Sequence, residues 1–395
     1  MKSAQLLLLL FALSAGPLVA QRVGHAPVVR GVATTSYLIT NDDLPGKIAA
    51  TSGTLFTIAS DGTPQNPNRV SLGGAGAGGG YFSAGRVSVL QSSTTPCAYL
   101  SLGSAAEVGG VDILAQQDIG NFAGSATDNG TDNGIGLVNN GTYLYASFST
   151  SNTVGTFAVL PGCALNFLGD ISPIGKHLGN VKGMAVHGNV LVLAYGDGSI
   201  ESFNVSAGIP VSNGDLQNAT GYTTDRFASG VDITQDGHYA IFGDMSTTTT
   251  VEVSDISSGK LTKTALYDVG TAGNSTSIFL SPDETLLYIA NTGNGKVTAA
   301  FFDQTTGKVS PGCTSATLKG FDNKWTFLSS PVTELNSGTG SVVYLAEFGA
   351  SSGMAVVNVT SSAGKCTLTE ATNSPVVDPD STVLLSIGVY PPRQF

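Results

Sequence analysis

The sequence has few charged side chains: they make up 11% of its 395 residues and leave a formal net charge of −11. An average globular domain carries about 25% charged residues, so polarity here depends on Ser, Thr, Asn and Gly. The scarcity of Lys and Arg excludes a protein that neutralises many phosphates, and we expect no nucleic-acid partner. The acidic balance also argues against an anionic membrane surface.

Long apolar runs are missing after the first 20 residues, so we expect no membrane span in the rest of the chain. At the start, Lys2 precedes an apolar run over 6–13, and small residues follow up to Ala20. This layout is typical of a secretory signal peptide. We expect cleavage after Ala20, with cleavage after Gly16 as the alternative, and a secreted, monomeric domain over 21–395.

Sustained 3.6-residue periodicity is absent, which argues against amphipathic helices. The sequence also lacks GxSxG, HExxH and P-loop motifs, so no hydrolase nucleophile, zincin site or nucleotide cradle is indicated.

What the sequence does contain is a phrase that recurs seven times: a β-rich run, a polar turn and a second β-rich run. Successive starts are 45 to 61 residues apart, and they are Tyr37, Ala98, Tyr143, Val190, Tyr239, Leu287 and Val343. A short apolar run precedes all but the first, as an innermost strand beside a narrow axis requires. These runs are 85–90, 135–138, 183–186, 230–234, 277–281 and 327–332. The pattern predicts an all-β fold, a seven-bladed β-propeller of four-stranded antiparallel blades.

The first repeat lacks an inner strand of its own, and the end of the chain has a spare one at 382–387. We expect this strand to complete blade 1, so that segments near both termini pair and close the ring. An N-terminal strand over 28–34 is the alternative closure.

Four cysteines, an even number behind a signal peptide, favour two disulfides. None lies in a CxxC cluster, which argues against a zinc site. Three pairings are possible, and we favour Cys97–Cys163 and Cys313–Cys366 because each would link neighbouring blades.

Six Asn-x-Ser/Thr triplets predict N-glycosylation: Asn129, Asn140, Asn204, Asn218, Asn274 and Asn358. Asn204 and Asn358 lie inside apolar alternation, and we expect these two to be the most prone to burial in strands.

In a propeller, the loops around one end of the axis form the usual binding face. The starts of the inner strands place Arg86, Lys182, Arg226 and Lys324 there, where basic groups could hold a small carboxylate or lactone. His177 lies in the loop entering blade 4, and Trp325 could stack on a ring beside Lys324. Ordinary solvated or packed side chains are the alternative interpretation.

Acidic groups recur at the ends of the second strands. Asp42, Asp197 and Asp244 take equivalent positions, with Glu347 in blade 7. Their oxygens could hold Ca²⁺, the one cofactor that the pattern suggests. Asp also favours hairpin turns, and that structural role is the more common one.

The segments 281–309 and 233–246, SPDETLLYIANTGNGKVTAAFFDQTTGKV and ITQDGHYAIFGDMS, resemble the repeat of lactonase-type seven-bladed propellers. That family includes 6-phosphogluconolactonase-like and 3-carboxymuconate lactonising proteins. The glycine-rich stretch 73–85 and the phrase from Tyr143 are similar to secreted fungal members called 3-carboxymuconate cyclase-like, some of them surface glycoproteins implicated in adhesion. The resemblance implies the fold more strongly than any activity.

Active relatives carry His-Pro where the chain enters inner strands, whereas DNGIGLV, NVKGMAV, RFASGVDI and NSTSIFL lack it here. We therefore favour a non-catalytic binding or adhesion glycoprotein with an extracellular or cell-wall ligand. The alternative is a secreted lactonase or cyclase that uses His177, Lys182, Arg226 and Glu347 as catalytic residues.

Overall fold

The computed structural model describes residues 35–42, 51–76, 85–91, 95–128, 135–173, 180–218, 228–244, 250–270, 275–321, 327–336, 341–348, 353–362, 364–379 and 386–392. All of them belong to one compact unit, Thr35–Phe395. The expected signal peptide and the alternative closing strand at 28–34 lie outside the described residues.

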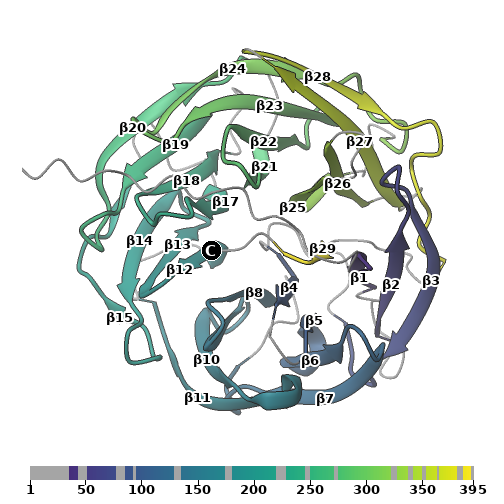
Figure 1. The fold of residues 1–395 in the computed structure, drawn as a ribbon. Helices are drawn as coiled ribbons and strands as arrows, with labels where there is room; N and C mark the ends of the chain where they lie inside the picture. Colours follow the sequence, from purple (N-terminus) through teal and green to yellow (C-terminus); the bar gives the residue numbers. More distant parts are fainter. Residues whose placement is uncertain are drawn as a thin grey trace, which may run out of the picture. The chain divides into compact units, whose positions relative to one another are not determined.

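The described strands form seven antiparallel sheets that follow one another around a common axis (Figure 1). In each blade the strands are called a to d from the axis outward. Blades 1 to 3 consist of β29 (Ser386–Tyr390), β1 (Tyr37–Asn41), β2 (Ser52–Ile58) and β3 (Pro64–Ser71); β4 (Val87–Leu90), β5 (Cys97–Leu102), β6 (Glu107–Asp112) and β7 (Gln117–Ala123); and β8 (Ile135–Asn139), β9 (Tyr143–Phe148), β10 (Thr153–Val159) and β11 (Leu165–Ile171).

Blade 4 departs from four strands because two short segments pair with its c strand. It consists of β12 (Val181–His187), β13 (Val190–Tyr195), β14 (Ser199–Asn204), β15 (Val211–Ser212) and β16 (Gln217–Asn218). Asp215, between the two outer segments, accepts hydrogen bonds from Ser202 N at 2.9 Å and from Leu261 N of blade 5 at 2.7 Å. The carboxylate thus takes the place of a strand residue and joins two blades.

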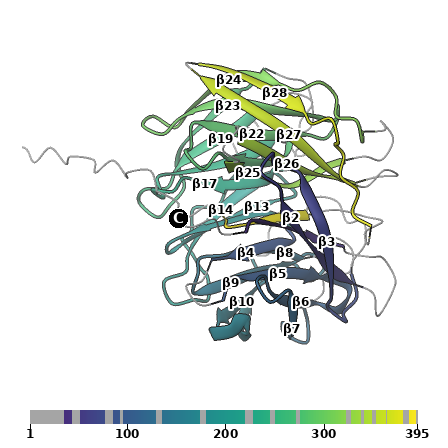
Figure 2. The same cartoon turned by 45° about the vertical axis from the view of Figure 1, so that its right-hand side comes forward.

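Blades 5 to 7 return to the regular layout. They consist of β17 (Ala228–Ile233), β18 (Tyr239–Asp244), β19 (Thr250–Asp255) and β20 (Thr262–Asp268); β21 (Ser275–Leu280), β22 (Leu286–Asn291), β23 (Lys296–Asp303) and β24 (Lys308–Thr314); and β25 (Phe327–Asn336), β26 (Ser341–Phe348), β27 (Gly353–Ser362) and β28 (Lys365–Glu370). Figure 2 shows the same sheets turned, with β24 and β28 at one side and β7 and β10 at the other. Two 3₁₀ turns, Gly103–Ala105 and Pro161–Cys163, are the only helical elements among the described residues, and none there could span a membrane.

The hydrophobic core lies between the blades, in seven clusters that each combine side chains of two neighbours. The cluster of Tyr288 and Val343, for example, joins blades 6 and 7, and that of Leu38 and Tyr344 joins blades 1 and 7. Because strand side chains alternate between the two faces of a sheet, each blade covers both of its neighbours. The inner strands also contact one another in an unbroken circuit from β4 through β8, β12, β17, β21, β25 and β29 back to β4.

The C-terminal strand closes the ring, as predicted. β29 pairs antiparallel with β1, with Tyr390 opposite Tyr37 and Ser386 opposite Asn41. The described strand, Ser386–Tyr390, overlaps the end of the expected 382–387, whose first residues lie outside the description. Its Ile387 and Val389 reach the buried cluster between blades 1 and 7.

Both predicted disulfides are present. Cys97–Cys163 joins blades 2 and 3, and Cys313–Cys366 joins blades 6 and 7. A second inter-blade link recurs at two junctions: Tyr145 Oη donates to Gly208 O at 3.1 Å, and Tyr344 Oη donates to Gly62 O at 2.6 Å.

Candidate functional site

The axis has two different ends, which we name by their loops. The a strands begin and the b strands end at the entry face, whereas the a–b and c–d turns lie at the turn face. All nominated catalytic, ligand-binding and metal residues were expected at the entry face.

Asp42, at the entry-face end of β1, is completely buried in a polar cluster of blade 1. Ser52 Oγ and Thr54 Oγ1 donate to its Oδ2. Thr40 Oγ1 lies 2.9 Å from Asp42 Oδ1 and 2.7 Å from Asp378 Oδ2, so its single hydrogen serves one carboxyl group at a time. Burial, reinforced by the charge of Asp378, raises the pKa of Asp42 to about 8. Asp42 therefore has a structural role, and its carboxyl group faces that of a second acid, Asp378.

The three nominated metal ligands are not brought together by the residues described. Asp197 accepts hydrogen bonds from Ser199 N at 3.0 Å and Ser199 Oγ at 2.6 Å, within the b–c turn of blade 4. The side chain of Asp244 lies outside the description. Among the described residues there is no group of three His, Cys, Asp or Glu that could hold a metal ion. A calcium site remains a prediction from the sequence.

Glu347 is also buried in its blade, although it was nominated as a catalytic acid. It lies on β26 opposite Gly353 of β27, and a Cβ added at Gly320 would collide with its Oε2. Burial and, to a smaller extent, the charge of Glu370 outweigh a hydrogen bond from the Gly320 backbone and together raise the pKa of Glu347 to about 8. The absence of a side chain at residue 320 is what makes room for this carboxyl group.

Arg86 and Lys182 stand at the starts of β4 and β12, where basic residues were expected, but neither is presented to solvent. Arg86 is 1% exposed and Lys182 is 9% exposed. Burial lowers the pKa of Arg86 to about 9 and lowers that of Lys182. The backbone of Arg86 also holds the closure, because its N–H donates to Ser386 Oγ of β29 at 2.8 Å.

The remaining nominated residues of this face, His177, Arg226, Lys324 and Trp325, lie outside the described residues. So do two of the sequons, Asn129 and Asn274, and the side chain of Asn218.

The other sequons lie at the turn face or toward it. Asn204 and Asn358 are exposed, which corrects the expectation that apolar alternation would bury them. Both stand on c strands with neighbours that point inward, so the Asn side chains point outward. The side-chain amide of Asn140 forms an inter-blade hydrogen bond, because its Nδ2 donates to Gly188 O of blade 4 at 3.0 Å. Glycan occupancy stays a prediction.

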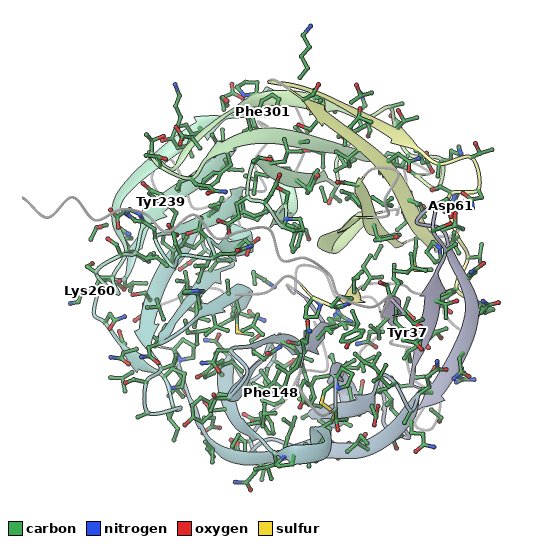
Figure 3. The ribbon with its side chains drawn as sticks, viewed as in Figure 1. Tyr37, Asp61, Phe148, Tyr239, Lys260 and Phe301 are labelled. Atoms are coloured by element: carbon green, nitrogen blue, oxygen red, sulfur yellow. A yellow bond between two sulfur atoms is a disulfide. The ribbon has the colours of Figure 1, made fainter. Side chains whose placement is uncertain are left out.

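A cavity of about 210 Å³ lies on the axis. It is lined from six blades by Gly85, Val87, Ser88, Val89, Leu137, Val138, Asn139, Met184, Ala185, Val186, Gly230, Val231, Asp232, Ile233, Ser277, Ile278, Phe279, Gly388, Val389 and Pro392. In most blades these residues come from the second half of the inner strand, so the cavity extends toward the turn face. Figure 3 shows Lys260 at the periphery of the ring, far from the axis.

The polar side chains of this axial cavity tie blades together. Asn139 Nδ2 donates to Ser88 Oγ at 2.7 Å, between blades 3 and 2. Asp232 accepts from Ile233 N at 2.8 Å and from Leu280 N of blade 6 at 2.7 Å. No Lys, Arg or His is among the described residues that line the cavity.

Asp232 and Asp378 are the site residues that the sequence did not reveal. A carboxylate inside the inner-strand run GVDI was a usable signal for Asp232, because charged residues are rarely buried without a partner. No local signal marks Asp378, since its neighbour Thr40 is 338 residues away.

Comparison with known proteins bears on the fold. No family model matches the chain, and no curated protein sequence matches it. Among solved structures, the periplasmic gluconolactonase of Pseudomonas aeruginosa matches at 14% identity and a TM-score of 0.64, over 90% of this chain and 99% of that one. A functionally unknown protein of Desulfotomaculum acetoxidans matches at 13% identity and a TM-score of 0.62, over 90% and 99%.

This chain has the seven-bladed β-propeller fold. The fold itself is shared more widely, since Kluyveromyces lactis Hsv2 matches at 11% identity and a TM-score of 0.53, over 82% of this chain and 93% of that one. At these identities the similarity between this chain and the solved structures concerns architecture alone. Any activity has to be argued from the site.

Proposed function

We propose that this protein is a secreted, N-glycosylated binding protein that keeps the lactonase-type propeller as a scaffold and has no turnover of its own. Its ligand belongs to the extracellular space or the cell wall. The signal-peptide layout and the sequons support secretion, and the exposure of Asn204 and Asn358 supports glycan attachment.

The burial of the nominated charges carries the proposal. A site that holds a carboxylate substrate needs cationic groups that contact it, and a general acid needs hydrogen-bond reach to the reacting atom. Arg86 and Glu347 are at most 1% exposed, and both pack within the ring. Their burial suits a structural role better than a catalytic one.

The test is a panel of sugar lactones and muconates incubated with the glycosylated protein, with and without Ca²⁺, alongside binding to cell-wall polysaccharide and matrix protein. We expect no turnover and saturable binding to one of the matrices. Robust turnover of any substrate would overturn the proposal.

A lactonase or cyclase is the second candidate. The architecture of a gluconolactonase and two buried acids with raised pKa values favour it, because perturbed acids concentrate at functional sites. This candidate requires His177 and Arg226 to act. H177A and R226A would then abolish turnover and leave the melting temperature unchanged.

A further inference from the structure

We propose that the outer rim of blades 2 to 4 is a docking surface for an extracellular protein segment that combines aliphatic side chains with Lys or Arg. The inference rests on the proposed function, because it names the class of ligand that the binding protein takes. It concerns the circumference of the ring and uses no residue of the entry face or of the axial cavity.

Exposed aliphatic side chains gather on this rim. Six of the eight large hydrophobic side chains that are exposed among the described residues belong to blades 2 to 4. We call these six the apolar arc: Leu114, Ile119, Leu160, Leu168, Ile209 and Val211. The outer strands of these blades, β7, β11 and β15, follow one another along the rim in Figure 1. Single exposed apolar residues are ordinary, whereas a group of neighbours marks an interaction surface.

A bulge in the outer strand gives Ile119 and Leu168 equivalent places in blades 2 and 3. The register of the β6–β7 ladder skips Ile119, and that of the β10–β11 ladder skips Leu168. In both strands the next residue is a glycine with positive φ, +135° at Gly120 and +151° at Gly169. The extra residue of a bulge bends its strand and re-aims a side chain. The same local geometry therefore presents both residues, which are 38% and 40% exposed.

The arc continues across both blade junctions. A Cβ added at Gly110 of blade 2 would contact both Ile119 Cβ, at 3.6 Å, and Cys163 O, at 3.3 Å. Ile119 thus lies beside the 3₁₀ turn of blade 3. At the next junction, a Cβ added at Gly169 would lie 3.2 Å from Ile209 Cδ1. Ile209 of blade 4 therefore lies against the bulged part of β11.

The blade 4 end of the arc adjoins a sequon. Val211 lies opposite Asn204 in the β14–β15 ladder. A glycan on Asn204 would therefore border the arc at this end. Leu160 and Leu168 of blade 3 are the residues of the arc to test, because they lie away from that ladder.

The charges of this rim are acidic. The sequence has no Lys or Arg between Arg86 and Lys176, so the strands of blades 2 and 3 carry no basic side chain. Asp112 and the exposed Asp118 lie within the arc, on either side of Leu114 in the chain. Basic groups of a partner would meet these acids, and such complementarity steers association and fixes orientation.

Two other occupants fit the arc less well. A second copy docked symmetrically through the same arc would place its acids opposite identical acids, and like charges across an interface cost free energy. Aromatic rings are the side chains that would stack on a sugar of a polysaccharide, whereas all six side chains of the arc are aliphatic. A protein segment with aliphatic and basic side chains matches both the apolar surface and its acids.

The opposite rim differs at the same turn and supplies the controls. At or directly after their c–d turns, blades 5, 6 and 7 carry the exposed residues Lys260, Lys308 and Lys365. Leu266 on β20 is exposed there as a single aliphatic residue. This rim offers cations where the arc offers aliphatic side chains.

Three fluorescein-labelled peptides of equal length separate the apolar and the charged contributions. One alternates Leu with Lys, the second alternates Leu with Glu, and the third alternates Ser with Lys. Anisotropy titrations with the secreted, glycosylated full chain would measure each dissociation constant. We expect saturable binding of the Leu–Lys peptide and binding about tenfold weaker or worse for the other two, because each lacks one contribution. Equal binding of the Leu–Lys and Ser–Lys peptides would overturn the proposal.

Matched variants place the contact on the arc. Leu168→Gln should weaken binding of the Leu–Lys peptide about tenfold, and Leu266→Gln is its control, because Leu266 is 38% exposed on another outer strand. Asp118→Asn should weaken binding about threefold, with Asp268→Asn as its control. Both of these exposed acids accept a hydrogen bond from the backbone N–H of the glycine two residues further on, at 3.0 and 2.8 Å.

Leu160→Gln decides the question if melting curves show that Leu168→Gln fails to fold. Parent-like binding in a folded arc variant, an equal loss in Leu266→Gln, or arc-dependent binding to chitin or β-glucan would each overturn the proposal. A dimer in sedimentation that Leu168→Gln dissociates would overturn it too, in favour of a second copy. Turnover of a lactone would refute the proposed function and leave these binding measurements valid, so the two failures are distinguishable.

Discussion

Blade 1 and blade 6 have the same four-strand layout, but the chain builds them differently. Blade 6 is one continuous segment, β21 to β24, and a disulfide ties its outer strand to blade 7. Blade 1 combines β1 to β3 with β29, which comes from the other end of the chain, and no disulfide reaches it among the described residues.

In blade 1, non-covalent contacts take the place of the continuous chain that connects all four strands of blade 6. Blade 1 holds its last strand through the β29–β1 ladder, the bond from Arg86 N to Ser386 Oγ and the buried cluster of Asp42, Thr40 and Asp378. Buried polar groups cost free energy unless they are bonded, so such a cluster fixes one arrangement of its partners. We infer that the closure of blade 1 is sensitive to pH, because its cluster contains two buried acids.

The largest expected effect is the loss of blade 1 closure. Deleting the last 15 residues, 381–395, removes β29, exposes the edge of β1 and opens the cluster between blades 1 and 7. We expect no cooperative thermal transition by circular dichroism. A chain that ends at Pro392 keeps β29 whole and should melt as the parent does. A cooperative, parent-like transition in the shorter chain would refute the closing role of β29.

The corresponding change in blade 6 should be smaller. The Cys313–Cys366 disulfide closes a loop with a sequence separation of 53 residues, and the chain-entropy estimate for such a loop is about 4 kcal/mol. C313A/C366A should therefore lower the free energy of unfolding by about 4 kcal/mol in urea titrations while the ring still forms. C97A/C163A, with a separation of 66, serves as the control junction. Failure of C313A/C366A to fold would show that blade 6 also depends on its covalent link.

The buried carboxyl group of Asp42 in blade 1 should make the stability of the protein depend on pH. The pKa of Asp42 is about 8 in the fold against an ordinary 3.8, so the folded state binds more protons than the unfolded state between these values. Its contribution is complete below pH 4 and is lost as pH rises through 8. At about 1.4 kcal/mol per unit, we expect the contribution of Asp42 to the free energy of unfolding to fall by about 4 kcal/mol between pH 5 and pH 8.

Urea titrations at pH 5, 6.5 and 8 test this fall, and Asp42→Asn should remove the share that Asp42 contributes while leaving that of Glu347, whose pKa is also about 8. Asp303 of blade 6 is the matched control: it is exposed, and hydrogen bonds from Thr306 and Thr305 lower its pKa. The contribution of Asp303 to stability is lost as pH falls below 4, which is the opposite direction to that of Asp42. Asp303→Asn should therefore leave the slope of stability against pH unchanged between pH 5 and 8. An unaltered slope in Asp42→Asn would assign the dependence to another group, with Glu347 the first to examine.

The sequence predicted the repeated blades, the closing strand and both disulfides, and it missed the side-chain contacts that form only in the folded ring. Seven similar phrases gave the blades, and inner runs such as 135–138 and 230–234 fell within a few residues of β8 and β17. Period-2 alternation is a local property, so it can be read from a single segment. The pairing of Asp42 with Asp378 depends on closure of the whole ring, and the burial of Arg86 depends on neighbouring blades. For the same reason, the sequence suggested that charged side chains such as Arg86 line an open entry face, whereas those that the structure describes there are buried between the blades.

The smallest expected effect compares the closing junction with an interior one through the same bond. Tyr344→Phe removes the donor to Gly62 O between blades 7 and 1, and Tyr145→Phe removes the donor to Gly208 O between blades 3 and 4. Each change removes one buried hydrogen bond, worth about 1 kcal/mol. Equal losses in urea titrations would show that the junction without chain continuity is as firm as an interior one. A loss at Tyr344 several times that at Tyr145 would show instead that blade 1 relies on this bond for its closure.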